Sequence, residues 1–192
     1  MWVRCLVGIA ISLLTVGLSG EHVRAQAPGA SGSSLPTDET LRRPSGETVT
    51  PTALTGEAGT AFLTWQPNCP WVGRYTDRVR RLASDFQSDG VRFVLVNPTP
   101  GRIESPDRPP ATYVEDPGGS FSQALGATRT PQAFLFDEAG VLVYKGAIDD
   151  SPSGPDRVKT PHLRMAIKAV VDGATVQTES QKALGCALSY EP

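Results

Sequence analysis

An apolar segment that ends just before a Cys-Pro pair is the feature that most restricts how this chain can fold. Residues 61–65 read Ala-Phe-Leu-Thr-Trp, a buried type of strand, and residues 66–68 form a short polar link. From Cys69 onward, apolar residues recur three and four positions apart, which predicts an amphipathic helix over 69–86. Pro70 suits the first helical position, where its missing N–H would have had no partner. The sequence therefore predicts a strand, a turn and a helix with a cysteine at the helix N-terminus.

This position has a chemical consequence for Cys69. The free N–H groups and the positive end of the helix dipole stabilise a thiolate, which is the nucleophilic form of cysteine. The alternative is a cysteine that is buried as a small apolar side chain, as free cysteines usually are. Because strand, turn, Cys-Pro and helix occur together, the pattern favours Cys69 as a catalytic nucleophile.

The first 27 residues are organised like a secretory signal peptide. Arg4 precedes an apolar run over residues 6–18, and residues 25–27 read Ala-Gln-Ala, a small-x-small cleavage pattern. The run is shorter than the about 20 residues of a membrane span. We therefore expect an exported protein, periplasmic or extracellular, which an uncleaved signal would anchor to the membrane.

Composition divides the rest of the chain into a linker and one domain. Residues 28–44 are rich in Gly, Ser, Pro and Ala without apolar periodicity, which predicts a disordered linker. Residues 45–192 have the size of one domain with a proper core. The formal net charge is −2, and no run of Lys or Arg stands out, so nucleic acid is not an expected partner.

Two cysteines remain after signal removal, Cys69 and Cys186. In an oxidising compartment an even pair indicates a disulfide or a redox couple. The two are 186 − 69 = 117 positions apart, and the spacing leaves open whether they meet in space. With His162 as the single histidine beyond residue 27, a closed zinc site is not expected. We predict neither a metal nor a cofactor.

Alternating patterns predict an α/β domain. Strands are expected at 46–50, 60–65, 91–97, 112–114, 133–136 and 141–144, and helices at 69–86, 120–125 and 161–172. Ser120 and Thr160 are the expected caps of the second and third helices. Arg74 and Arg78 fall on the solvent face of the first helix, away from its apolar stripe.

Four sequence pieces carry a resemblance to a known fold: Asn68-Cys69-Pro70, Thr130-Pro131, residues 144–150 and Gly185-Cys186. Together with the element order, they resemble the thioredoxin-like fold, a three-layer α/β/α sandwich with a central mixed β-sheet. The chain is most similar to exported redoxin proteins, which are grouped with alkyl hydroperoxide reductase and thiol-specific antioxidant domains. The resemblance covers about residues 46–190.

The resemblance implies where the active site lies. Thr130-Pro131 matches the cis-proline position beside the active-site cysteine, and the backbone of Thr130 would bind an extended thiol substrate. It follows that Pro70, Trp71, Thr130 and Pro131 are the candidate substrate-binding residues.

The chain departs from the standard patterns of this fold. A dithiol oxidoreductase uses Cys-x-x-Cys so that the second thiol resolves the mixed disulfide, yet Val72 occupies that place. Peroxiredoxins carry a proline seven residues before the cysteine, where this chain has Phe62. Copper-delivering redoxins use Cys-x-x-x-Cys, and Gly73 stands there instead.

Two hypotheses remain from the sequence. In the first, Cys69 attacks a disulfide or a peroxide and Cys186 resolves the product, so the partner is a disulfide-bearing protein, a small thiol or a peroxide. Arg74 and Arg129 would stabilise a leaving oxygen, unless they are simply solvated. In the second, the protein is a non-enzymatic binding module, and a structural Cys69–Cys186 bridge contributes on the order of 4 kcal/mol.

Overall fold

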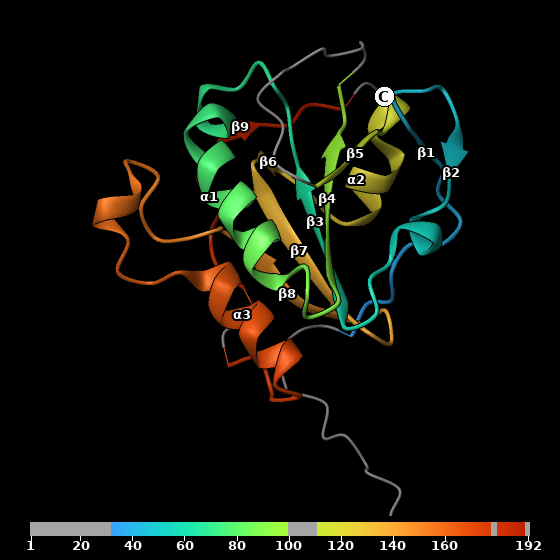
Figure 1. Ribbon diagram of the computed structural model, residues 1–192. Helices are drawn as coiled ribbons and strands as arrows, with labels where there is room; N and C mark the ends of the chain where they lie inside the picture. Colours follow the sequence, from blue (N-terminus) through green and yellow to red (C-terminus); the bar gives the residue numbers. More distant parts are fainter. Residues whose placement is uncertain (1–31, 100–110, 178–179, 191–192) are drawn as a thin grey trace, which may run out of the picture.

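The computed structural model describes residues 32–99, 111–177 and 180–190. The predicted signal peptide lies outside these residues, as does most of the proline-rich loop after the 91–97 strand. The described chain forms a seven-stranded mixed sheet with helices on both faces, which confirms the predicted α/β class (Figure 1). The helices are α1 Pro70–Phe86, α2 Ser120–Ala124 and α3 His162–Val171. Short 3-10 helices cover Pro51–Leu54, Pro117–Gly119 and Pro155–Arg157.

The main sheet has the strand order β2-β1-β5-β4-β3-β7-β8. Its strands are β1 Leu41–Arg42, β2 Thr48–Val49, β3 Gly59–Thr64, β4 Val91–Asn97, β5 Thr112–Glu115, β7 Gln132–Asp137 and β8 Leu142–Gly146. A separate two-stranded sheet joins β6 Arg129–Thr130 to β9 Cys186–Ala187.

Strand β3 lies inside the main sheet and makes it mixed. It runs parallel to β4 and antiparallel to β7, and β4 in turn runs parallel to β5. All six residues of β3 are buried, as expected for a nearly continuous apolar strand that is covered on both faces. The strands predicted at 60–65 and 91–97 and the helix between them form the parallel unit β3-α1-β4. The strands predicted at 133–136 and 141–144 form the antiparallel hairpin β7-β8.

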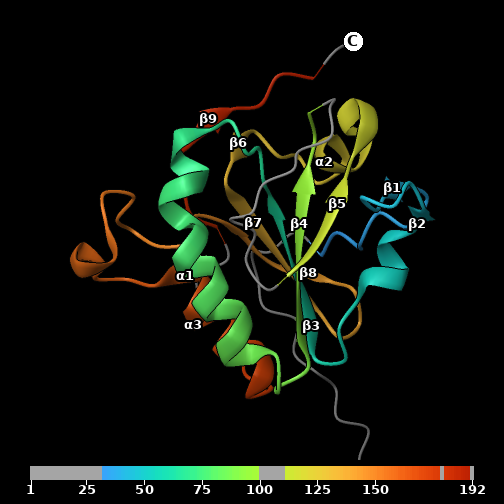
Figure 2. The same ribbon diagram turned by 45° about the horizontal axis from the view of Figure 1, so that its top comes forward.

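The helices form two layers around this sheet. Helices α1 and α3 pack on one face and α2 on the other (Figure 2). The α1 stripe of Val72, Val79 and Leu82 is buried in the first core cluster. On the opposite face, the rings of Phe62 and Phe121 meet edge to face at 5.1 Å. The predicted three-layer arrangement is therefore observed.

The part of the expected linker that the structure describes, residues 32–44, is packed on the domain. Leu35 is 6% exposed and Leu41 is 1% exposed, and both belong to the second core cluster. Ser34 forms a bridge to Val141, and β1 joins β2 to β5. The prediction of disorder was wrong for residues 32–44. It rested on the polar composition of this segment, whereas its two leucines are buried in the core.

Two predicted helix caps also differ from the structure. The N-cap of α2 is Gly119, in a left-handed conformation, and Ser120 is already helical. The capping role falls to the buried carboxylate of Asp116, which accepts hydrogen bonds from the N–H groups of Phe121 and Ser122. Helix α3 begins at His162 with Pro161 as its N-cap, and no side chain caps it.

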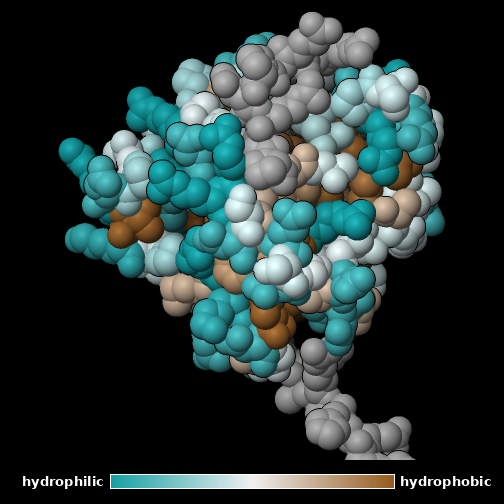
Figure 3. Space-filling view, in the orientation of Figure 1, coloured by the Kyte–Doolittle hydropathy of each residue, from teal (hydrophilic) through white to brown (hydrophobic). Residues whose placement is uncertain are grey.

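The surface of the described residues is mainly polar. Figure 3 shows one face that is largely hydrophilic, with small and separate hydrophobic patches. Met165 and Leu184 are the large apolar side chains with high exposure, at 55% and 51%. Within residues 32–99, 111–177 and 180–190, no helix has the length and apolar character needed to cross a bilayer.

Candidate active site

Cys69 is the N-cap of α1, directly after the turn that follows β3. Its N–H donates to the carbonyl oxygen of Gln66 at 2.9 Å, and its own carbonyl accepts from Val72 N–H at 3.0 Å. The side chain is 4% exposed. The strand, turn and helix expected from the sequence are therefore present, with the sulfur at the positive end of a 17-residue helix.

Cys69 is joined to Cys186 by a disulfide bond across 117 residues, with the two Cα atoms 6.0 Å apart. Cys186 belongs to β9, which pairs antiparallel with β6 so that Cys186 lies opposite Thr130. Both ribbon views place β9 beside the start of α1 (Figures 1 and 2). The tertiary structure thus brings the two cysteines together, which their spacing could not decide.

The Thr130-Pro131 peptide bond is cis, as the resemblance implied. Both residues are buried. The carbonyl oxygen of Thr130 lies 3.4 Å from Cys69 Sγ. Three of the expected site residues, Cys69, Thr130 and Pro131, therefore form one group with Cys186.

Buried hydroxyl groups hold the cis-proline loop in place. The Thr130 hydroxyl donates to the carbonyl of Thr64 at 3.1 Å and accepts from the Gln66 N–H at 2.9 Å. The Thr64 hydroxyl lies 2.7 Å from the carbonyl oxygen of Arg129 and accepts from the Gln132 N–H at 2.9 Å. These bonds fix the loop to the turn that precedes Cys69.

Sequence reasoning missed Thr64 and Gln132 as parts of this site. The Gln132 Oε1 atom accepts the N–H groups of Thr128 and Arg129, so it closes the loop from the other side. Thr64 and Gln132 are register partners on β3 and β7. The sequence does show one polar residue at the end of each of these two buried strands. It does not show that the two strands pair, so it could not indicate that Thr64 and Gln132 lie together.

The two remaining candidates lie in the first turn of α1. Trp71 is half-buried against the core, and the Arg74 guanidinium stands 5.0 Å from its ring centroid in a cation–π arrangement. Pro70 is exposed. Val72, at the place of a second active-site cysteine, is 3% exposed and packs in the core.

Arg78 is not on a solvated face, which corrects the sequence prediction. Its side chain is 10% exposed and forms an ion pair with Asp149, which is 5% exposed, at 2.7 Å. The Tyr75 hydroxyl donates to the same carboxylate at 3.1 Å. Burial raises the pKa of Tyr75 well above its usual value, and the negative charge of Asp149 adds to this. The helical pattern placed Arg78 outside because the carboxylate that covers it lies far along the chain.

The neighbouring Asp150 has a different role from Asp149. Its carboxylate accepts a hydrogen bond from Lys159 N–H at 2.9 Å in the loop before α3. A backbone hydrogen bond with Thr160 is the main cause that lowers the pKa of Asp150. Asp150 therefore stabilises a bend in a polar loop.

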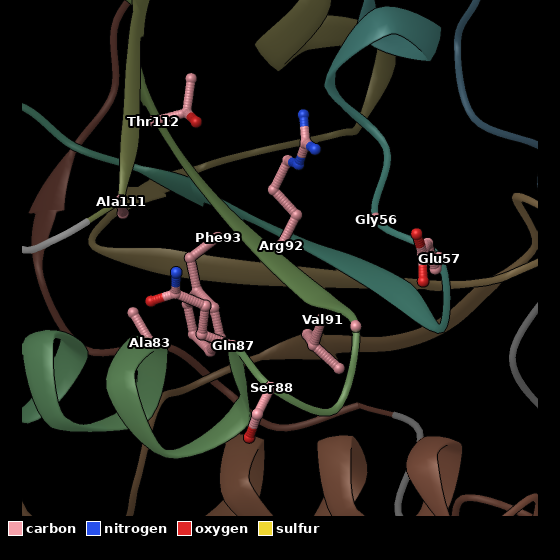
Figure 4. Close-up of a pocket in the computed structure, with 11 residues that line it drawn as sticks. Gly56, Glu57, Ala83, Gln87, Ser88, Val91, Arg92, Phe93, Ala111 and Thr112 are labelled. Atoms are coloured by element: carbon pink, nitrogen blue, oxygen red, sulfur yellow. The ribbon is translucent and has the colours of Figure 1, made fainter.

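A pocket of about 710 Å³ lies at the other end of α1. Ala83 lines it from the helix, Gln87 and Ser88 from the turn that follows the helix, and Phe93 and Thr112 from the sheet (Figure 4). It contains none of the expected site residues. Among the described residues, no group of three His, Cys, Asp or Glu side chains is placed to hold a metal ion.

Comparison with solved structures identifies the fold. The chain is similar to a hypothetical protein from Sinorhizobium meliloti 1021 (25% identity, TM-score 0.73, covering 83% of this chain and 94% of the other). It is also similar to an uncharacterized conserved protein from Geobacillus kaustophilus (26%, 0.73, covering 84% and 92%). The thioredoxin domain of a thiol-disulfide oxidoreductase from Bacteroides vulgatus matches at 19% identity and TM-score 0.52, covering 61% and 88%.

The chain thus has a thioredoxin-like fold. No protein-family model and no curated protein gave a match. The narrower resemblance to redoxin proteins remains a prediction.

Proposed function

We propose that the protein is an exported thiol-disulfide redox protein in which Cys69 and Cys186 alternate between dithiol and disulfide. The observation that supports this most strongly is the position of the disulfide. It joins the N-cap of α1 to a segment beside the cis-proline at 131. At that position the helix favours the thiolate of Cys69, so Cys69 is both a good nucleophile and a good leaving group.

Reduction of the disulfide would begin at Cys186. Cys186 is partly exposed, whereas Cys69 is 4% exposed, so an incoming thiolate reaches the Cys186 sulfur first. The partner sulfur bonds to Cys186 Sγ, and the Cys69–Cys186 bond breaks to release the Cys69 thiolate. A second partner thiol then displaces Cys186. The partner dithiol becomes a disulfide, and this protein becomes a dithiol.

Oxidation would begin at Cys69. Its thiolate attacks a substrate disulfide, and one substrate thiol leaves. Cys186 then attacks Cys69 Sγ, which releases the second substrate thiol and restores the internal disulfide. With a peroxide, Cys69 instead becomes a sulfenic acid as an alcohol or water leaves, and condensation with Cys186 releases water.

A structural role for the bridge is the second candidate, and the burial of Cys69 favours it. The two functions differ in how readily the bond is reduced. Redox-active pairs in this fold have potentials of roughly −120 to −270 mV, whereas structural disulfides lie below about −300 mV.

The experiment is a redox titration of the mature native chain in dithiothreitol buffers, with alkylation and mass spectrometry of both cysteines. We expect a midpoint inside the active range, without denaturant, and recovery of the bond after addition of oxidant. A bond that opens only on unfolding would establish the structural role instead.

A further inference from the structure

The C-terminal segment of the chain, residues 180–190, lies on the edge that a thiol substrate would need. Strand β9 pairs with β6 and places Cys186 opposite Thr130. The N–H of Leu188 donates to the carbonyl of Thr128 at 3.0 Å and extends this pairing. The chain's own tail therefore lies beside the cis-proline as an extended strand whose cysteine is bonded to Cys69.

Gly185 fits this place for a steric reason. A Cβ atom there would lie 2.8 Å from the carbonyl carbon of Thr130 and closer still to its oxygen. The obstacle is backbone that is held by buried hydrogen bonds, so it cannot move aside as a flexible side chain would. The surface at Thr130 therefore accepts a cysteine that is preceded by glycine. It excludes a cysteine that is preceded by a larger residue.

Two further contacts hold the tail at its ends. Gln181 packs on the backbone of Gly146 and donates its N–H to Lys145 at 3.1 Å. The Tyr190 ring lies over Gly119, where a Cβ atom would come within 2.5 Å of it, and its hydroxyl donates to Ala127 at 2.9 Å. Burial, with the negative charge of Asp116, raises the pKa of Tyr190 to about 12.

Between these ends, apart from Cys186, the apolar anchoring of the tail comes from Ala183, which is 6% exposed, and from Leu188, which is partly buried against the second core cluster. Leu184 is 51% exposed and Ala187 is exposed, and only two residue pairs make up the β6–β9 sheet. The covalent bond is therefore a main restraint on residues 184–188. When it is reduced, the edge at Thr130 becomes available.

Thr130 is already the expected substrate-binding residue; we propose that its edge selects extended segments in which glycine precedes the reactive cysteine, and that residues 184–188 occupy this edge in the disulfide form. The inference rests on the proposed function and specifies its partner. Cys69 would bond to the cysteine of the partner in the place that Cys186 now holds.

The test uses the full mature chain with Cys186→Ser, which keeps the Cys69 thiol and the whole tail. The probe is the hexapeptide Ala-Leu-Gly-Cys-Ala-Leu, the sequence of residues 183–188, with its cysteine linked to thionitrobenzoate. Cys69 attacks the peptide sulfur, the mixed disulfide forms, and coloured thionitrobenzoate leaves. A matched peptide carries Ala in place of Gly, and both rates are normalised to the rates with glutathione.

We expect the glycine peptide to react about tenfold faster than the alanine peptide, because the added Cβ atom would overlap the backbone of Thr130. Equal normalised rates would overturn the inference. If Cys69 reacts with a small aromatic disulfide but with neither peptide, the inference fails while the proposed function stands. If Cys69 reacts with no disulfide at all, both fail.

A second variant tests whether the tail occupies the site. Tyr190→Ala, added to Cys186→Ser, should raise the rate with the glycine peptide several-fold by loosening the tail, while Tyr190→Phe should have a smaller effect, since it keeps the ring over Gly119. An unchanged rate in Tyr190→Ala would show that the tail does not compete, and that part of the proposal would be wrong.

Discussion

Two of the ties that hold helix α1 to distant parts of the chain differ in kind. At its N-terminus, Cys69 is bonded to Cys186 in a tail whose strand β9 joins β6 through two residue pairs. Farther along the helix, Arg78 is paired with Asp149, 71 residues away, and Tyr75 joins them. The first tie can be opened by a thiol. A thiol cannot open the second tie, which is an ion pair. Separating its partners would leave each of them as a buried charge without its counter-charge.

This difference indicates which part of the molecule can move during a redox cycle. The buried stripe of α1 and its ion pair do not depend on the disulfide, so the helix keeps Cys69 in place when the bond opens. The tail has no comparable core. The redox change should therefore be confined to residues 180–190.

The largest expected effect separates the two cysteines. Cys69→Ser should abolish reduction of a substrate disulfide, because the nucleophile is lost. Cys186→Ser should retain one turnover per chain, ending as a mixed disulfide at Cys69. A burst assay with mass spectrometry measures this, and equal loss in both variants would indicate a structural bridge.

The next largest effect tests the ion pair between Arg78 and Asp149. Asp149→Asn should lower the free energy of unfolding by about 3–5 kcal/mol, because it leaves the buried Arg78 without its counter-charge. Asp156→Asn, in an exposed position of the short helix Pro155–Arg157, is the matched control and should change stability little. Urea unfolding of both variants in the disulfide form measures the difference, and similar losses would refute the distinction.

Reduction should affect the two ties unequally. In hydrogen exchange, residues 180–190 should lose protection in the reduced chain, while α1 should keep it because its contacts are in the core. Mass spectrometry with and without reductant follows both segments. Loss of protection along α1 would mean that the disulfide also holds the helix.

A smaller effect concerns the fit of the tail. Gly185→Ala should make the disulfide easier to reduce by about 1–3 kcal/mol, since its Cβ meets the Thr130 backbone only when the tail is docked. Gly154→Ala, where a Cβ meets nothing within 4 Å, is the control. Redox titration compares them, and an unchanged midpoint in Gly185→Ala would argue against the close contact.

The smallest expected effect is a pH dependence of the folding stability, caused by Asp116, whose charge acts on Tyr190 of the tail. Burial raises the pKa of Asp116 above its usual value, so the folded state binds a proton more readily than the unfolded state. Its contribution to stability is present below the usual pKa and is lost as pH rises through the folded value. Relative to Asp116→Asn, the native chain should therefore lose stability as pH rises above the usual carboxyl pKa of about 4. Denaturant unfolding across this range measures the difference, and parallel curves would contradict it.

Much of the fold followed from local patterns. The 91–97 strand agrees residue for residue with β4. The strand β3, the turn and the helix α1 also lie where periodicity predicted them, with Cys69 at the start of the helix. These elements are predictable because the apolar spacing of a strand or helix reflects which of its own faces is buried. The cis-proline at 131 followed from the resemblance rather than from spacing.

The tertiary structure alone decided which distant residues meet. Three contacts join segments whose proximity no sequence pattern indicates. They are the Cys69–Cys186 bond, the Arg78–Asp149 ion pair and the packing of Leu35 and Leu41 in the core. Local periodicity reports burial but not the partner that causes it, because docking depends on the whole sheet. The sequence by itself therefore determined a cysteine at a helix N-terminus, and the tertiary structure placed the tail cysteine against it.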